Sequence, residues 1–215
     1  MNRIPNSGRR GPWAVALFLV CIFSAGPFVL AQARQYTFSP GDSRLEVHVP
    51  KAGLLSAMGH DHLIRALTFS GRVDFADGAS AGNGLVLEVP VSALTVADPE
   101  VGEETRLKIE SEMRGSDVLA GKPYPVIRFK ADRITIDKSG KWRVSGFLHL
   151  RGRSRQIEFL AEVTYPRDGR MLAEGSLALE PEVFGIEPVA ALGGMVRTAD
   201  TVEIRFRITG ILQPR

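Results

Sequence analysis

The chain has 215 residues, with 27 basic and 24 acidic side chains and a single cysteine. The first 33 residues hold three of the basic residues (Arg3, Arg9 and Arg10) and none of the acidic ones, so residues 34–215 carry 24 charges of each sign. The basic excess therefore belongs to the N-terminal segment and gives no support for nucleic-acid binding. Because Cys21 also lies in that segment, residues 34–215 exclude a disulfide, a thiolate nucleophile and a cysteine metal site.

The N-terminal segment has the layout of a secretory signal peptide. Residues 13–30 are almost wholly apolar, arginines precede them, and Ala31-Gln32-Ala33 supplies the small residues of a cleavage site. A retained membrane anchor is the alternative, since an apolar run of this length nearly spans a bilayer. Gly26-Pro27 near the end of the run favours cleavage, so we expect a periplasmic or secreted protein consisting of one domain, residues 34–215.

From Tyr36 onward, apolar and polar residues alternate with a period of two. This pattern gives each segment one apolar and one wet face, as in antiparallel sheets that cover a single core. Pairs such as Ser139-Gly140, Arg151-Gly152 and Asp168-Gly169 separate the segments and are typical of tight turns. The alternating segments are residues 45–49, 67–75, 85–91, 127–131, 144–150, 157–163 and 202–208.

One segment breaks this rhythm and predicts a short helix. Asp98-Pro99 has the residue types of a helix start, with Asp as the cap and Pro at the first helical position. Apolar or small residues then recur every four positions up to Gly115, which is expected to end the helix; they are Val101, Thr105, Ile109 and Met113.

The sequence therefore predicts an all-β fold, with about eight antiparallel strands and one short α-helix. A sandwich and a closed barrel both fit such a pattern, but closure removes exposed strand edges and leaves room for one small ligand. Gly71, Gly146 and Gly175 fall on the inward phase of their strands, where they suit sharp curvature. A lipocalin-like barrel is the favoured architecture.

Several motifs, taken in order, resemble the YceI-like family of lipid- or polyisoprenoid-binding proteins. The match covers essentially all of residues 34–215, and its motifs in chain order are Tyr36-Thr37-Phe38 with Asp42-Ser43-Arg44-Leu45, Phe69-Ser70-Gly71-Arg72-Val73-Asp74-Phe75, Met113-Arg114-Gly115-Ser116-Asp117-Val118-Leu119, Tyr124-Pro125-Val126-Ile127-Arg128-Phe129, Gly146-Phe147-Leu148-His149-Leu150-Arg151-Gly152 and Phe184-Gly185-Ile186. Two places depart from the family pattern: Glu180-Pro181-Glu182 stands where an arginine is common, and the loop Gly59-His60-Asp61-His62 is unusual.

The resemblance implies an antiparallel barrel that encloses a long apolar ligand, such as an isoprenoid chain, a quinone or another lipid. Inward-facing residues of the strands would line it, and the irregular apolar segments 52–58 and 183–186 would form its mouth. Ordinary core packing is the alternative for all of them. The predicted ligand-binding residues are Leu54, Leu55, Met58, Phe69, Ile127, Phe129, Leu148, Phe159 and Phe184.

His60 and His62 form a candidate metal site. Residues two apart in extended chain face the same way, so both imidazoles can reach one divalent ion. A hydrogen-bonded turn after Gly59 is the alternative, since two ligands alone make a poor metal site. A periplasmic metal-binding module is accordingly the second functional hypothesis.

A catalytic function has little support in the sequence. Residues 34–215 contain no Gly-x-Ser-x-Gly and no His-Glu-x-x-His, and a triad of His60 or His62 with Asp61 and Ser56 would rest on spacing alone. We expect no enzyme activity and no cofactor, with a hydrolase as the least favoured class. The basic hairpin Arg151-Gly152-Arg153-Ser154-Arg155 is either a solvated turn or a site for an anionic head group or transient membrane contact.

Overall fold

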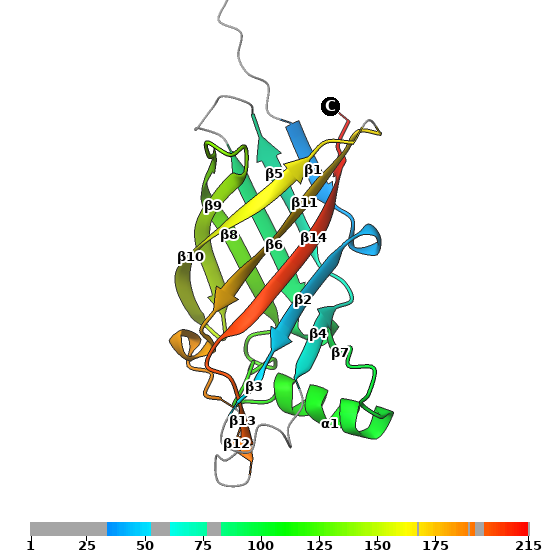
Figure 1. Ribbon diagram of the computed structural model, residues 1–215, viewed down its shortest axis with the longest axis vertical. Coiled ribbons are helices and arrows are strands. Elements are labelled where there is room, and N and C mark those ends of the chain that lie inside the picture. Colours follow the sequence, from blue (N-terminus) through cyan, green and yellow to red (C-terminus); the bar gives the residue numbers. More distant parts are fainter. Residues whose placement is uncertain are drawn as a thin grey trace, which may run out of the picture. The chain divides into compact units, whose positions relative to one another are not determined.

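The computed structural model describes residues 34–52, 61–76, 83–166, 168–188, 190–191 and 196–214. Its eight-stranded antiparallel barrel with one α-helix confirms the predicted fold class (Figure 1). Pairing of the first strand with the last, Tyr36 opposite Leu212, closes the barrel. Its strands, in order around the barrel, are β1 (Arg34–Phe38), β5 (Ser70–Phe75), β6 (Gly84–Pro90), β8 (Val126–Ile136), β9 (Trp142–Leu150), β10 (Arg153–Thr164), β11 (Arg170–Leu179) and β14 (Val202–Leu212).

β14 has two different partners on the edge away from β11. Its C-terminal part pairs with β1, whereas its N-terminal part pairs with β2 (Arg44–Val49). The sheet continues from β2 to β4 (His62–Ala66) and β7 (Leu94–Val96). A separate small sheet contains β3 (Lys51–Ala52), β12 (Ala190–Ala191) and β13 (Val196–Thr198).

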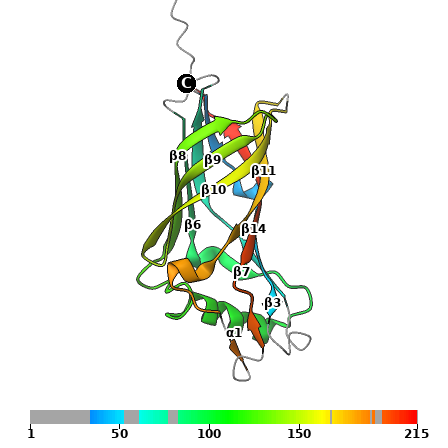
Figure 2. The same cartoon turned by 60° about the vertical axis from the view of Figure 1, so that its left-hand side comes forward.

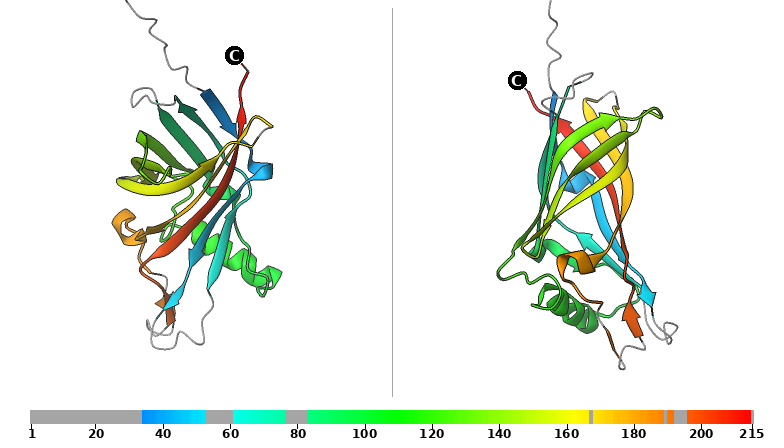
Figure 3. Two further views of the ribbon diagram at one scale, coloured as in Figure 1. Left: turned by 45° about the horizontal axis from the view of Figure 1, so that its top comes forward. Right: turned by 90° about the vertical axis from the view of Figure 1, so that its left-hand side faces the viewer.

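The two ends of the barrel differ. We call the end with the β8–β9 turn the hairpin end, and the end with the β9–β10 turn the helix end. α1 (Glu103–Arg114) and η4 (Pro181–Phe184) both lie at the helix end (Figures 1, 2 and 3). The short 3-10 helix η1 (Pro40–Asp42) connects β1 to β2, and η3 (Val91–Ala93) connects β6 to β7.

The hairpin end is filled by protein. The rings of Phe75 and Trp142 stack with their centroids 4.1 Å apart. Val73, Ile134 and Met171 are among the most deeply buried side chains in the described residues. Alternation along β5, β8, β9 and β11 aims all of these side chains inward, so the predicted period of two produces the core directly.

The β9–β10 turn lies at Arg151 and Gly152, where the sequence predicted a tight turn. Arg151 and Gly152 both have positive φ, 49° and 71°, as a two-residue hairpin of this hand requires. A side chain at Gly152 would also collide with the Tyr124 ring, 2.6 Å from the position of an added Cβ. Both the sterics and the backbone conformation therefore select glycine here.

α1 begins later than predicted. It starts at Glu103 after Gly102, and ends at Gly115 as expected. The prediction of a start at Asp98 is wrong because the Asp98 carboxylate is used elsewhere: it accepts a 2.5 Å hydrogen bond from the Leu63 backbone N–H. That contact ties the residues after β7 to β4, a strand that the alternation pattern did not identify.

The segment before β5 also differs from the prediction. The apolar alternation was expected to start at Leu67, but Leu67 is exposed and β5 begins at Ser70. The Leu67 backbone N–H instead donates to Ala93 O at 2.9 Å, because β4 ends at Ala66 and pairs with β7. Phe69 keeps its expected inward position and is buried.

Candidate functional site

The half of the barrel toward the helix end contains inward-facing apolar side chains that are only partly buried. On β10, Ile157 lies opposite Gly146 and Phe159 lies opposite Val144, whose side chain is fully buried inside the barrel. Residues directly opposite in an antiparallel pair share a face, so Ile157 and Phe159 point inward. Both nevertheless keep accessible surface.

The next two strands show the same feature. Ile204 and Phe206 of β14 lie opposite Leu177 and Gly175 of β11, on the inward phase. Ile204, Phe206 and Leu177 are all of intermediate burial. The Phe206 ring also reaches the outer surface beside Gly175. The partly buried inward-facing side chains of β10, β11 and β14 form the candidate binding surface, which we call the interior wall: Ile157, Phe159, Leu177, Ile204 and Phe206.

Three aromatic rings connect this wall with the opposite side of the barrel interior. Phe129 of β8 and Phe159 have ring centroids 5.5 Å apart, and Phe159 and Phe206 have theirs 5.4 Å apart. Phe129 is 5% exposed and Leu148 is 7% exposed, so these two predicted ligand residues are well packed. Ile127 and Phe159 retain more surface.

The structure thus brings four predicted ligand residues, Ile127, Phe129, Leu148 and Phe159, onto one interior surface. Phe184 is completely buried in η4, and Phe69 is buried just before β5. Leu54, Leu55 and Met58 lie outside the described residues. The sequence reasoning did not name Ile157, Leu177, Ile204 and Phe206 as candidates, although the alternation of apolar residues that placed Phe159 inward also runs through β11 and β14.

His62, one of the two predicted metal ligands, has a carboxylate partner. Its Nδ1 lies 2.8 Å from Asp98 Oδ2, while the other oxygen of Asp98 accepts from Leu63 N. Asp61 points elsewhere and accepts a 3.0 Å hydrogen bond from Lys51 N. His60 lies outside the described residues, and within them no three histidine, cysteine or acidic side chains gather as a metal site. The metal site stays a prediction.

The helix is fixed to the sheet by a buried charge. Glu110 accepts hydrogen bonds from Thr95 Oγ1 at 2.5 Å and from Val96 N at 3.0 Å, and Arg114 lies 3.2 Å away. Burial opposes ionisation of Glu110, but these hydrogen bonds and the guanidinium groups of Arg114 and Arg106 outweigh it and lower its pKa below the usual value. Glu110 therefore anchors α1 to β7 as a carboxylate.

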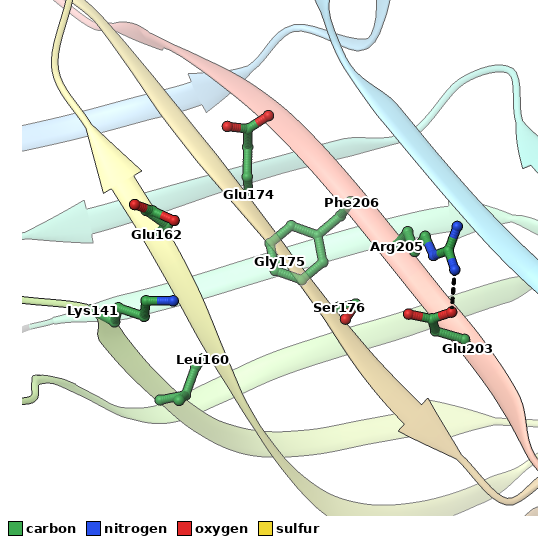
Figure 4. A pocket seen from close by; sticks show the side chains of 9 residues that line it. All are labelled: Lys141, Leu160, Glu162, Glu174, Gly175, Ser176, Glu203, Arg205 and Phe206. Atoms are coloured by element: carbon green, nitrogen blue, oxygen red, sulfur yellow. Dashed lines mark hydrogen bonds and ion pairs between the residues drawn. The ribbon is translucent and has the colours of Figure 1, made fainter. Parts of the chain in front are cut away.

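The outer surface has a polar depression of about 510 Å³ over β10, β11 and β14 (Figure 4). Its rim carries Glu162, Glu174 and Glu203, and its floor includes Gly175 and the Phe206 ring. Arg205 donates to Glu203 at 2.6 Å, and this hydrogen bond lowers the pKa of Glu203. Carboxylates at the rim do not suit an apolar chain, so the interior wall is the better candidate site.

A second depression of about 320 Å³ lies outside the barrel near the helix end. Arg128 and His149 face each other across β8 and β9 there, and Tyr124 packs on Gly152. Glu88 already pairs with Arg128 at 2.6 Å. In the described part of the chain, no helix has the length and apolar character needed to cross a membrane.

Comparison with known proteins agrees with this geometry. The family model of the YceI-like domain matches residues 36–210. Among curated proteins, no sequence relative matches. Solved structures do: BcnA from Burkholderia cenocepacia superposes with a TM-score of 0.64 at 18% identity, covering 80% of this chain and 98% of BcnA.

Two other structures share the fold. A polyisoprenoid binding domain from Saccharophagus degradans gives a TM-score of 0.59 at 13% identity, covering 83% of this chain and 98% of its own. The YCEI protein of Campylobacter jejuni gives 0.55 at 16% identity, covering 71% and 85%. Since the family model spans nearly all of the barrel, from β1 to β14, this chain belongs to the YceI-like domain family.

Proposed function

We propose that this protein is exported and holds a long apolar ligand, an isoprenoid, a quinone or another lipid, inside its barrel without chemistry on it. The observation that carries the proposal is the interior wall. Its five inward-facing apolar side chains keep accessible surface in the middle and helix-end part of the barrel, whereas the hairpin end is packed. Apolar surface exposed inside a concave site gains free energy when a hydrocarbon chain covers it.

The chemistry of the wall suits a chain-like ligand. It offers aliphatic side chains and the edge-to-face rings of Phe159 and Phe206, which bind by contact and dispersion. One structural neighbour is a polyisoprenoid binding domain, and its likeness in fold supports a ligand of that class here. The signal-like residues 1–33 support export. Outside the cytoplasm, such a protein would carry water-insoluble molecules through an aqueous compartment.

The test uses the full chain, expressed with its N-terminal segment and purified from the extracytoplasmic fraction. We expect the intact mass to be that of a chain that begins near Arg34. Extraction of the protein with organic solvent should release a co-purified isoprenoid or fatty lipid. Added quinone or prenyl chains should bind stoichiometrically in titration calorimetry. Protein that retains residues 1–33 would contradict export by cleavage, and repeated absence of both native and added lipid would contradict the carrier function.

A pair of substitutions locates the site. Ile204→Trp fills the space before the interior wall and should weaken binding by at least about tenfold, because the indole occupies the volume that the ligand needs. Leu160→Trp places the same ring on the outer face of β10, where Leu160 is exposed, and should leave affinity unchanged. Equal loss in both variants would show that the ligand does not lie against this wall.

A further inference from the structure

We propose that the ligand carries an anionic head group, which Arg153 and Arg155 bind at the helix end of the barrel. This inference rests on the proposed lipid-binding function and goes on to name the chemical class of the ligand. Arg153 lies opposite Leu150 and Arg155 lies opposite Leu148 in the β9–β10 ladder. Leu148 and Leu150 point into the barrel, so both arginine side chains leave β10 from its interior face.

The exposed side chain of Arg153 extends to Gly185. Its Cζ lies 2.7 Å from where an added Cβ would be, and Gly185 has a φ of +74°. Gly185 stands between Phe184 and Ile186, both buried, and η4 contacts β10 at this end of the barrel. Arg155 donates to Ser154 O at 2.9 Å. The positive charge of Arg153 is thus positioned beside the packed apolar residues that border the interior.

Neither guanidinium has an ion-pair partner among the described residues. Arginines on the outer faces of the strands do: Arg128 pairs with Glu88 at 2.6 Å, and Arg207 with Glu174 at 3.3 Å. Arg143 pairs with Glu158, which lies diagonally across the β9–β10 ladder on the outer side. These three outer-face arginines are each neutralised by a carboxylate, whereas Arg153 and Arg155 on the interior face keep their positive charge and hydrogen-bond donors for a ligand.

The spacing along β10 fits one amphiphile. Arg153, Arg155, Ile157 and Phe159 follow one another on the same face, about 6.6 Å apart from one to the next. A chain lying against Phe159 and Ile157 therefore ends at Arg155 and Arg153. Guanidinium forks suit phosphate and carboxylate oxygens and form charge-assisted hydrogen bonds with them. The geometry points to a single apolar chain with a phosphate or carboxylate end, a prenyl phosphate or a fatty acid.

The experiment compares ligands that share a chain and differ in head group: farnesyl phosphate with farnesol, and oleate with oleyl alcohol. Binding is measured by calorimetry at pH 8 for the wild-type protein, for Arg153→Gln with Arg155→Gln, and for Arg133→Gln. Arg133 is exposed and lies opposite Ser145 on the outer face of β8, without an ion pair among the described residues, so its substitution removes the same charge away from the site.

We expect the anionic member of at least one pair to bind at least about tenfold more tightly than its alcohol, the gain of one or two charge-assisted hydrogen bonds. The double substitution should abolish this preference and leave the alcohols bound as before, which also shows that the variant is folded. Arg133→Gln should change neither the affinities nor the preference.

Preference for farnesyl phosphate alone identifies a phosphate ligand, and preference for oleate alone identifies a carboxylate ligand. Equal affinity for acid and alcohol, or an unchanged preference in the double variant, overturns the head-group site but keeps the carrier function. Absence of binding by all four lipids overturns both.

Discussion

At the scale of single residues, two glycines in β-strands have opposite tolerance for a side chain. At Gly146, in the middle of β9, an added Cβ would collide with Lys130 O and lie 2.5 Å from Ala131 Cα. At Gly84, the first residue of β6, nothing lies within 4 Å of the same atom. Both have ordinary backbone dihedrals, so the difference comes only from how closely the adjoining strand approaches.

Gly146→Ala should therefore lower the free energy of unfolding by roughly 1–3 kcal/mol, the range for forcing an extra methyl into a close-packed site. The obstacle is backbone, which can move only by distorting the β8–β9 ladder. Gly84→Ala, the matched control, should be neutral or slightly stabilising because it reduces the freedom of the unfolded chain. Urea denaturation of both variants measures this; equal stability of the two would contradict the close approach.

At the scale of elements, the short helix is attached to the barrel by apolar and by charged side chains. Of the predicted stripe, Ile109 and Met113 pack against the core, but Thr105 is exposed and Val101 precedes the helix. The buried residue of the helix is Glu110. Its carboxylate satisfies the Val96 N–H and the Thr95 hydroxyl on β7. These polar contacts add to the packing of Ile109 and Met113 and fix the position of the helix on β7.

Glu110→Ala should lower the free energy of unfolding by about 2 kcal/mol at pH 7, less than the 3–5 kcal/mol of a fully buried ion pair because Arg114 keeps contact with water. The Glu110 side chain is 7% exposed and that of Arg114 is 36% exposed. Glu112→Ala on the exposed side of α1 is the control and should change stability by less than about 0.5 kcal/mol.

The stability that Glu110 contributes decreases as the pH falls. Because the folded protein lowers the pKa of Glu110, its carboxylate contributes stability above the unfolded value of about 4.3, and this contribution is lost as pH falls through the lower folded pKa. The stability difference between the wild type and Glu110→Ala should thus be constant from pH 7 to about 5 and narrow below about 4. A difference that stays the same down to pH 3 would mean that Glu110 is not ionised in the folded state.

At the scale of the whole molecule, inward-facing side chains are closely packed at the hairpin end of the barrel and less buried toward the helix end. The stacked pair Phe75 and Trp142 fills the hairpin end, whereas Ile157 and Phe159 are only partly buried. In the proposed function, the same closed wall is a hydrophobic core in one half and a binding surface in the other. Stability and binding then depend on different residues, which allows them to be separated by substitution.

Phe129 and Phe159 test this division, since their rings touch but their burial differs. Phe129→Ala should cost the roughly 3–5 kcal/mol of a close-packed core position, and Phe159→Ala clearly less, because its ring already borders space. A saturating prenyl ligand should raise the stability of the wild type by about 2.7 kcal/mol at 100 times its dissociation constant. The same ligand should raise the stability of Phe159→Ala by less, because this variant makes less contact with it.

Thermal and urea denaturation with and without farnesol measures both the cost of each substitution and the stabilisation by the ligand. Equal cost for the two substitutions, with no ligand effect on the melting temperature, would show that the interior is packed solid along its whole length. The barrel would then lack the space on which the carrier function depends.

The sequence alone determined the alternating strands, the β9–β10 turn at Arg151 and Gly152, the end of the helix at Gly115 and the family. These features depend on the two-residue pleat and on local backbone conformation, which are legible in a few neighbouring residues. Only the tertiary structure decided that Asp98 serves β4, that Glu110 is buried, and that Arg153 and Arg155 share the interior face with Ile157. It also decided that Phe129 is buried while Phe159, whose ring lies beside it, is only partly buried. Those outcomes depend on which strands pair and on the volume left between facing walls, and both are set by residues far apart in the chain.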